Sequence, residues 1–397
     1  MIPIELELLE PLGRLQSRPW ADAFTGVQID SRRVEEGDLF VAVNSGADFI
    51  PHALARGAAA TLVPGHPHAA LAVIAGTVRD RSSARVVGIT GSTGKTTTKD
   101  ILAALCSPHL RTIASEANYN NELGVPLTLC RIEPDTELCI VEMGMRGLGQ
   151  IEWLASFTRP DVALITNIGP VHLELVQTIV NVARAKAELV DALPPGGTAV
   201  VPDDPLLEPF LRRTDIEIRR FGHVEDPASF PVETNYTARH QLDNTLAALA
   251  VCEVLGVPTP EKLDVVFTPL REEELQLDHD VLLLNDCYNA NPLSMHAALA
   301  HLVERAGDRR RVAVLGEMAE LGESAVDYHR EIGRHAADLG VIVIAVGPLA
   351  RDYGGTWVET AVEAAAALGQ LLEPGDVVLV KGSRSVGLEA VAAKLSA

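Results

Sequence analysis

The residues with the clearest chemical potential stand together at Thr90–Thr98, which reads Thr-Gly-Ser-Thr-Gly-Lys-Thr-Thr-Thr. An apolar run at 85–89 precedes them, and an apolar helical face follows at 101–105. This order predicts a phosphate-binding loop, because the N–H groups of a glycine-rich turn and a helix N-terminus both attract anions. Lys95 would reach the β- and γ-phosphates, and the Thr96 hydroxyl would hold Mg²⁺. We therefore expect the ATP phosphates to contact Gly91, Ser92, Thr93, Gly94, Lys95, Thr96 and Thr97.

This loop is shorter than the usual G-x-x-x-x-G-K-T pattern, which would need glycine at Ile89. The alternative interpretation is a glycine-rich turn with a lysine placed there by chance. The position of both glycines between a strand and a helix favours nucleotide binding.

A carboxylate, Glu142, lies near the end of the apolar run 138–144. Ligands of open α/β sheets lie beyond the carboxyl ends of the strands, so Glu142 is expected to approach the Mg²⁺ that Thr96 would hold. The alternative is a strand-end cap. The need of Mg²⁺ for acidic or water ligands favours the metal role.

Two polar turns have alternative interpretations from the residues alone. Ser31 and Arg32 end an apolar run and suit a diphosphate or a ribose, although a solvated turn is favoured there. Asn118, Asn120 and Asn121 offer amides to a sugar or a peptide, although asparagines also form turns.

Lysine is scarce in this chain, with only six among the 33 basic residues. Arginine is therefore the ordinary surface cation, and a lysine is weakly favoured to act as a compact, titratable amine. This argument points to Lys95, Lys186 and Lys381, although Lys186 alone is typical of a solvated helix. His240 and Asn244 share a helix face and by themselves indicate a cap or an exposed pair.

Composition limits the class of protein. The net charge of −21 without a basic cluster argues against nucleic acid or an anionic membrane as the main partner. No apolar run reaches the ~18 residues of a membrane helix, and the acidic N-terminal stretch is unlike a signal peptide. Five cysteines without a C-x-x-C motif indicate core thiols. We expect a cytoplasmic enzyme.

Alternating strand and helix patterns predict an α/β protein of three domains. A small N-terminal α/β domain is expected at 1–82, a central P-loop domain with a mostly parallel sheet at 83–271, and a doubly wound, Rossmann-like domain at 272–397. The polar segment 79–84 is interpreted as the first linker. The charge run 271–274 is interpreted as the second boundary.

Ten stretches carry a resemblance to a known family. They are IDSRRVEEGDLFVAV (29–43), TGSTGKTTT (90–98), NYNNELGVPLTL (118–129), VEMG (141–144), TNIGPVHLE (166–174), ARAKAE (183–188), RHQLDNTLAALA (239–250), DCYNANPLSM (286–295), VAVLGEMAELGE (312–323) and VKGSR (380–384). These stretches extend over all three expected domains and follow the order found in the Mur ligases. On them, the chain resembles the Mur ligases, which are ATP-dependent amide-forming enzymes of peptidoglycan synthesis.

The resemblance implies the activity of the branch that adds D-alanyl-D-alanine to UDP-N-acetylmuramoyl-tripeptide. The tripeptide carboxylate would attack the γ-phosphate, and the dipeptide amine would then attack the acyl phosphate. The C-terminal domain would close to exclude water. Apart from the resemblance, we expect a cytoplasmic monomer without nucleic acid or membrane insertion.

The resemblance also implies roles for single residues. Asn244, Arg271 and Asn291 would contact the nucleotide. The UDP moiety would contact Ser31 and Arg32, and the sugar-peptide would contact Asn118 and Asn120.

The remaining implied roles concern two Mg²⁺ ions. Thr96 and Glu142 would hold one, and His172 would help to hold the second together with Lys186 carrying a carbamate. Only a neutral lysine amine can take up CO₂ to become such an anionic ligand. Lys95, Glu142, His172 and Lys186 are thus the implied catalytic residues.

Three departures from the family pattern stand out. Pro269-Leu270-Arg271 replaces a Gly-Arg pair, which leaves the γ-phosphate role of Arg271 open. Glu317 stands where the family has aspartate, and its role is also open. Residues 205–238 read as irregular and shortened, so the central domain is expected to lack strands found in relatives.

Other functions stay open at this point. They are a sister ligase that adds the third peptide residue, a ligase that adds glutamates to folate, a P-loop ATPase or kinase that makes no amide bond, and a non-catalytic nucleotide-binding module. The UDP-type N-terminal stretch disfavours folate.

Overall fold

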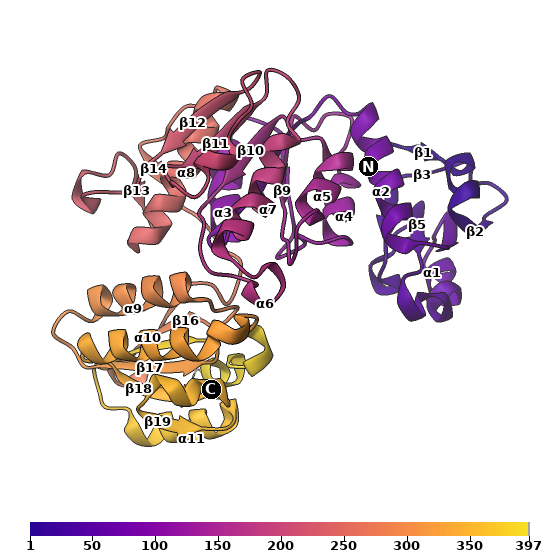
Figure 1. Ribbon diagram of the computed structural model, residues 1–397. Helices are drawn as coiled ribbons and strands as arrows, with labels where there is room; N and C mark the ends of the chain where they lie inside the picture. The colour runs from indigo at the N-terminus through magenta and orange to yellow at the C-terminus, as the bar shows by residue number, and fades with distance from the viewer. Residues whose placement is uncertain (396–397) are drawn as a thin grey trace.

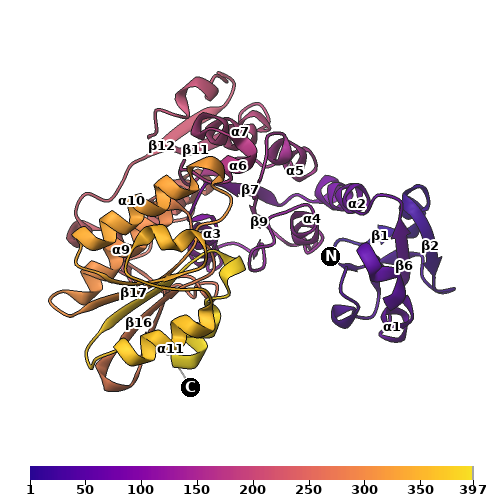
Figure 2. The ribbon, with the colours of Figure 1, turned by 60° about the horizontal axis from the view of Figure 1, so that its bottom comes forward.

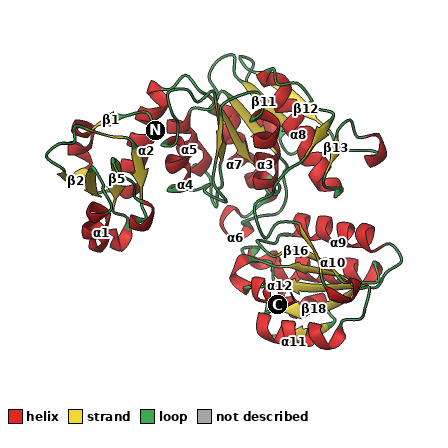
Figure 3. Cartoon of the chain, turned by 180° about the vertical axis from the view of Figure 1, so that it is seen from behind, coloured by secondary structure: helices red, strands yellow, loops and turns green. Residues whose placement is uncertain are grey.

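The computed structural model describes residues 1–395, arranged as three layered units along the chain (Figure 1). Strands and helices alternate through the second and third units, as the sequence pattern predicts (Figure 3). Within residues 1–395, no helix is both long and apolar enough to cross a membrane. The predicted domain bounds of 82/83 and 271/272 stay predictions.

The N-terminal unit is built on a four-stranded sheet of order β2-β6-β5-β4, in which β2 is antiparallel to β6 and the other pairs are parallel. A short antiparallel pair, β1 with β3, lies beside it. The elements are β1 (Ile4–Glu5), β2 (Gly13–Ser17), β3 (Ala23–Phe24), β4 (Gly26–Gln28), β5 (Asp38–Val41), α1 (Ile50–Ala55), β6 (Ala60–Pro64) and α2 (Pro67–Arg81).

Helix α2 corrects the prediction that 79–84 is a linker. The helix continues to Arg81, and the Arg79 guanidinium donates to the carbonyls of Thr158 and Arg159 and pairs with Asp161 at 3.0 Å. Figure 2 shows α2 beside the helices of the central unit. The charged residues at 79–81 suggested a linker, but they form the last turn of α2. The apolar residues that precede them in this helix pack between the two units.

The central unit has a six-stranded, wholly parallel sheet of order β12-β11-β10-β7-β9-β8. Its strands are β7 (Arg85–Thr90), β8 (Thr112–Ala114), β9 (Leu138–Glu142), β10 (Val162–Ile165), β11 (Thr198–Pro202) and β12 (Glu217–Phe221). Its helices are α3 (Lys95–Cys106), α4 (Gly124–Leu129), α5 (Gln150–Thr158), α6 (Leu173–Val176), α7 (Ile179–Asp191) and α8 (Arg239–Leu255), and β13 (Glu233–Thr234) pairs with β14 (Lys262–Leu263).

Alternate residues of this sheet enter two cores, as the two-residue period of a strand requires. Val86 and Val141 pack with α4, α5 and α7 on one face, while Val87 and Ile140 pack with α3 and α8 on the other. The prediction of irregular structure at 205–238 is wrong for β12, which extends the sheet next to β11. Its half-exposed sequence Glu-Ile-Arg-Arg-Phe lacks the apolar run of an inner strand.

The C-terminal unit has a six-stranded sheet of order β15-β16-β20-β17-β18-β19, parallel except for the edge strand β15. The elements are β15 (Glu273–Gln276), β16 (Leu282–Asp286), α9 (Pro292–Ala306), β17 (Arg311–Gly316), α10 (Ala325–Asp338), β18 (Ile342–Val346), β19 (Thr356–Val358), α11 (Ala361–Leu371), β20 (Val377–Lys381) and α12 (Glu389–Leu395). Helices α9 and α10 cover one face, and α11 and α12 cover the other, which confirms the doubly wound arrangement. The charge run 271–274 overlaps the first two residues of β15.

The five cysteines, Cys106, Cys130, Cys139, Cys252 and Cys287, are all buried and reduced, as the sequence predicts. Their burial inside parallel sheets and helix faces fits the role of small apolar core residues.

Candidate active site

The phosphate-binding loop connects β7 to α3 and depends on both of its glycines. Gly91 has φ +154° and Gly94 has φ +73°, and a Cβ on Gly91 would lie 1.8 Å from the Thr166 hydroxyl. The loop is braced from β10, because the Asn167 side chain accepts from the Thr93 N–H at 2.9 Å and donates to the Thr93 hydroxyl at 2.8 Å. The conformation of the loop is therefore fixed by its glycines and by contacts with the residues that follow β10.

Lys95 is the first residue of α3, and its ammonium group donates back to the Gly91 carbonyl at 2.8 Å. Burial lowers the pKa of Lys95, while the charge of nearby Glu142 opposes that shift. A phosphate entering the loop would give this ammonium group an anionic partner in place of a carbonyl.

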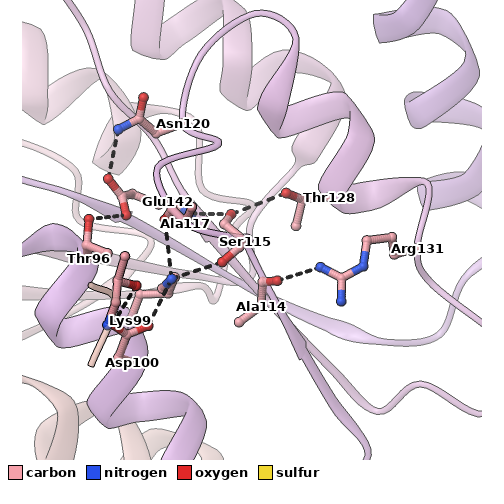
Figure 4. Close-up of polar contacts among 11 residues, drawn as sticks. Thr96, Lys99, Asp100, Ala114, Ser115, Ala117, Asn120, Thr128, Arg131 and Glu142 are labelled. Carbon is pink, nitrogen blue, oxygen red and sulfur yellow. Dashed lines mark hydrogen bonds and ion pairs between the residues drawn. The ribbon is translucent and has the colours of Figure 1, made fainter. Parts of the chain in front are cut away.

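Glu142 lies at the carboxyl end of β9, as predicted, and is almost fully buried (Figure 4). One carboxylate oxygen accepts from the Thr96 hydroxyl at 2.8 Å, and the other accepts from the Asn120 amide at 2.8 Å. A buried carboxylate beside a hydroxyl at the mouth of a phosphate-binding loop fits Mg²⁺, which prefers oxygen ligands and shares them with substrate phosphates. The contact between Asn120 and Glu142 joins the Asn-rich loop, residues 118–121, to the candidate metal site.

Lys186, on α7, is only 2% exposed. Within residues 1–395, no hydrogen-bond or ion-pair partner of its ammonium group is recorded. Burial, and then the positive charge of Lys95, lower the pKa of Lys186 well below its ordinary value. A buried, unpartnered amine that favours its neutral form fits the chemistry of carbamate formation, so the solvated-helix interpretation is wrong.

His172 precedes α6 in a left-handed conformation with φ +52°. Its Nδ1 contacts the Glu320 carboxylate, which comes from the loop after β17 in the C-terminal unit. Burial lowers the pKa of His172, and the Glu320 contact opposes the shift. The imidazole thus sits where the central and C-terminal units meet.

A cavity of about 1010 Å³ lies between these two units and collects most of the predicted residues. Its lining includes Gly91, Ser92, Thr93, Gly94, Lys95, Thr96, Thr97, Asn118, Asn120, Glu142, His172, Lys186, Asn244, Arg271 and Asn291. The fold therefore brings together every residue that we expected around ATP, Mg²⁺ and the sugar-peptide.

Three of these residues approach from outside the loop. Asn244 on α8 is buried against Gly94, since a Cβ there would lie 2.5 Å from the Asn244 Oδ1; the cap or exposed-pair interpretation is wrong for it. The Arg271 guanidinium stacks 4.0 Å from the centre of the Tyr288 ring, and its Nε has no hydrogen-bond partner among residues 1–395. Asn291 caps α9 through the Ser294 N–H at 3.0 Å.

Ser31 and Arg32 do not line this cavity and lie in the N-terminal unit. Ser31 is buried, with its hydroxyl 2.9 Å from the His52 Nδ1, and Arg32 is exposed and pairs with Asp30. The next residue, Arg33, pairs with Glu116 at 2.9 Å, two residues before Asn118. The turn 31–33 therefore touches the loop that enters the cavity.

Sequence reasoning missed a buried polar cluster at the second boundary. His240 pairs with Glu272 at 2.7 Å, and Lys381 pairs with Asp286 and donates to the Asn289 carbonyl at 3.0 Å. The scarcity of lysine pointed to Lys381, but nothing local in the sequence indicated these partners. Asn167 was also missed, although it ends a predicted strand.

The comparisons with known proteins agree on one family. The Mur ligase middle domain model matches residues 89–229, and the model described as Mur ligase, glutamate ligase domain matches residues 271–384. Relatives named UDP-N-acetylmuramoyl-tripeptide–D-alanyl-D-alanine ligase include one from Synechocystis sp., 36% identical over 93% of this chain and 91% of its own length. Another, from Escherichia coli, is 32% identical over 98% of each chain.

Solved structures give the same result. MurF from Acinetobacter baumannii covers 99% of both chains with a TM-score of 0.88 at 27% identity. MurF ligase from Thermotoga maritima in complex with ADP covers 94% of this chain and 97% of that chain, with a TM-score of 0.82 at 29% identity.

Proposed function

The chain belongs to the Mur ligase family, and we propose that it joins D-alanyl-D-alanine to UDP-N-acetylmuramoyl-tripeptide with the cleavage of ATP to ADP and phosphate. The observation that carries this proposal is the near-complete match, above 30% identity, to relatives of that name. The fold of an ADP-bound relative and the loop of Lys95 support ATP as the energy source.

In the proposed first step, an oxygen of the tripeptide carboxylate attacks the γ-phosphorus of ATP, and the bond to ADP breaks. Lys95 and the N–H groups of the loop 91–97 stabilise the charge on the phosphoryl oxygens. Bound Mg²⁺ would neutralise the same phosphates, held by Thr96 and Glu142 and, at a second position, by His172 and Lys186 as a carbamate.

In the second step, the dipeptide amine attacks the carbonyl carbon of the acyl phosphate, phosphate leaves, and the nitrogen loses a proton. Asn118 and Asn120 would orient the sugar-peptide, while Ser31 and Arg32 would contact the UDP moiety. Asn244, Arg271 and Asn291 would bind the nucleotide from the α8 and C-terminal side of the cavity. We further propose a cytoplasmic, monomeric enzyme.

The test is release of phosphate from ATP with UDP-N-acetylmuramoyl-tripeptide, with and without D-alanyl-D-alanine, followed by mass analysis of the product. We expect release to need both substrates and the product to gain one dipeptide. Phosphate release that ignores the dipeptide, with no new amide, would indicate an ATPase. A product heavier by a single amino acid would indicate a sister ligase.

A further inference from the structure

Lys99 is a buried lysine that the proposed mechanism does not use. It lies one turn after Thr96 on α3, is 3% exposed and does not line the cavity. Figure 4 shows its ammonium group directed at the segment that follows β8. The group donates to the Ser115 carbonyl at 2.9 Å and to the Ala117 carbonyl at 3.4 Å, and pairs with Asp100 at 2.9 Å.

The carbonyls held by Lys99 belong to the segment that carries Asn118 and Asn120 into the cavity. Ala117 has φ +44°, a left-handed conformation that its Cβ disfavours, so the segment needs external restraint to keep this course. The Ser115 hydroxyl accepts from the backbone N–H of Glu142 at 3.0 Å. The clamped segment therefore borders both the candidate substrate amides and the candidate metal carboxylate.

Asp100 links this site to a second segment. Its other carboxylate oxygen accepts from the backbone N–H and the hydroxyl of Thr268, each at 2.9 Å. Thr268 precedes Arg271 by three residues. The adjacent residues Lys99 and Asp100 thus connect the phosphate-binding helix to the Asn-rich loop and to the segment that leads to Arg271.

We propose that Lys99 is a positioning residue for the sugar-peptide substrate, acting through the loop that carries Asn118 and Asn120. A buried ion pair is weak evidence for stability, because apolar residues of similar volume often replace such pairs at no cost. Here the Lys99 ammonium group holds the Ser115 and Ala117 carbonyls at a fixed position relative to helix α3. The inference rests on the proposed function, because it names the substrate that this loop orients.

The first test compares Lys99→Met with Lys99→Arg. The matched control is Lys262→Met, which removes an exposed lysine that does not line the cavity. In Lys99→Met, the KM for UDP-N-acetylmuramoyl-tripeptide should rise about tenfold to a hundredfold, because misplaced orienting groups cost that much. The KM for ATP should change by less than about threefold, because the Lys99 ammonium group contacts no residue of the phosphate-binding loop 91–97. Lys99→Arg keeps the charge and should restore part of the loss.

The second test is a double-mutant cycle with Asn120→Ala. If Lys99 acts through this loop, Lys99→Met in the Asn120→Ala background should add little to the rise in KM. Additive effects, or equal changes in KM for both substrates, would overturn the proposal. A thermal melt shows whether Lys99→Met folds. If it does not fold, the same double-mutant cycle is carried out with Lys99→Arg and tests the proposal by the same criterion. A wild-type enzyme inactive on the tripeptide would instead refute the proposed function.

Discussion

Replacing Glu142 by glutamine would separate a metal-binding role from a structural one. The carboxylate accepts hydrogen bonds from Thr96 and Asn120, each at 2.8 Å. Glutamine keeps one acceptor oxygen for one of these donors and turns an NH₂ group towards the other. The two functions of the carboxylate, accepting hydrogen bonds and carrying charge, are thereby affected differently.

Two opposing terms determine the stability of the ligand-free Glu142→Gln variant. A hydrogen bond to a charged group contributes about 1.5–3 kcal/mol and a neutral one about 0.5–1.5 kcal/mol. The substitution therefore weakens both bonds, since the glutamine oxygen can accept from Asn120 and the Thr96 hydroxyl can accept from the glutamine NH₂. It also removes a buried charge, which relieves a desolvation cost of several kcal/mol but loses the attraction between the carboxylate and the Lys95 ammonium group. We expect the free energy of unfolding to change by no more than about 2 kcal/mol.

Glu142→Ala is the contrasting variant. Alanine leaves both donors unpaired and opens a void, so this variant should be destabilised by about 3 kcal/mol or more.

The assay is thermal unfolding with ATP, with and without Mg²⁺. A ligand at a hundred times its dissociation constant stabilises the folded state by about 2.7 kcal/mol. At roughly 2–4 °C per kcal/mol, this corresponds to a rise of about 5–10 °C in the unfolding temperature of the wild type. Glu142→Gln should lose the Mg²⁺-dependent part of this rise, and turnover should fall by about a hundredfold to a thousandfold.

Two results would refute the reasoning. A full Mg²⁺-dependent rise in Glu142→Gln would show that the carboxylate does not hold the metal. An unfolding temperature without ligand as low as that of Glu142→Ala would show that the carboxylate is mainly a strand-end cap.

Three further predictions concern other parts of the site and its surroundings. Gly94→Ala should weaken ADP binding at least about tenfold in calorimetry, because alanine resists φ +73° by about 1–2 kcal/mol and its Cβ would press on Asn244. Lys186→Met should abolish amide formation in the phosphate-release assay, because methionine cannot form a carbamate, while ADP affinity stays within about threefold. The hydrogen bond from His301 contributes most to lowering the pKa of Glu274 to about 2, so Glu274 stabilises the fold above its unfolded pKa of about 4.3. That stability is lost as the pH falls through about 2, and in urea titrations the difference between wild type and Glu274→Gln should disappear over this interval.

Each of these predictions has its own control. Gly149→Ala introduces the same left-handed strain at φ +80° with nothing within 4 Å, and should leave ADP binding intact; an equal loss in both variants would point to general strain. Turnover in Lys186→Met would exclude the carbamate. A constant difference between wild type and Glu274→Gln from pH 5 to pH 2 would contradict the assignment for Glu274.

The sequence predicted best what is local. The strand, loop and helix around Lys95, and the carboxylate at the end of the next inner strand, follow from residue order and the apolar run of buried parallel strands. Lys186 and Asn244, taken alone, were interpreted as ordinary polar residues of solvent-facing helix surfaces. The sequence pattern of a helix does not show which other element of the fold packs on each of its faces. Edge strand β12 escaped prediction for a related reason, since half of its residues remain near solvent.

The distribution of the cores indicates which boundary can move. One apolar core runs from Leu39 and Leu62 through Ile74 on α2 to Leu154 and other residues of the central unit, so separating these two units would expose buried apolar surface. The buried residues of the two apolar cores in the C-terminal unit all lie at position 281 or later, so these cores share no buried residue with the other units.

Ion pairs across the second boundary include His240 with Glu272 and His172 with Glu320, and the Leu293 side chain lies beside Gly169. A boundary with polar contacts of this kind resembles a transient interface more than the shared apolar core at the first boundary does. The cavity lies at this boundary, so we expect a change in the position of the C-terminal unit to leave the apolar cores on both sides intact. The turn 31–33 belongs instead to a unit that shares its core with the central one, so the UDP moiety would be bound at a fixed distance from the phosphate-binding loop.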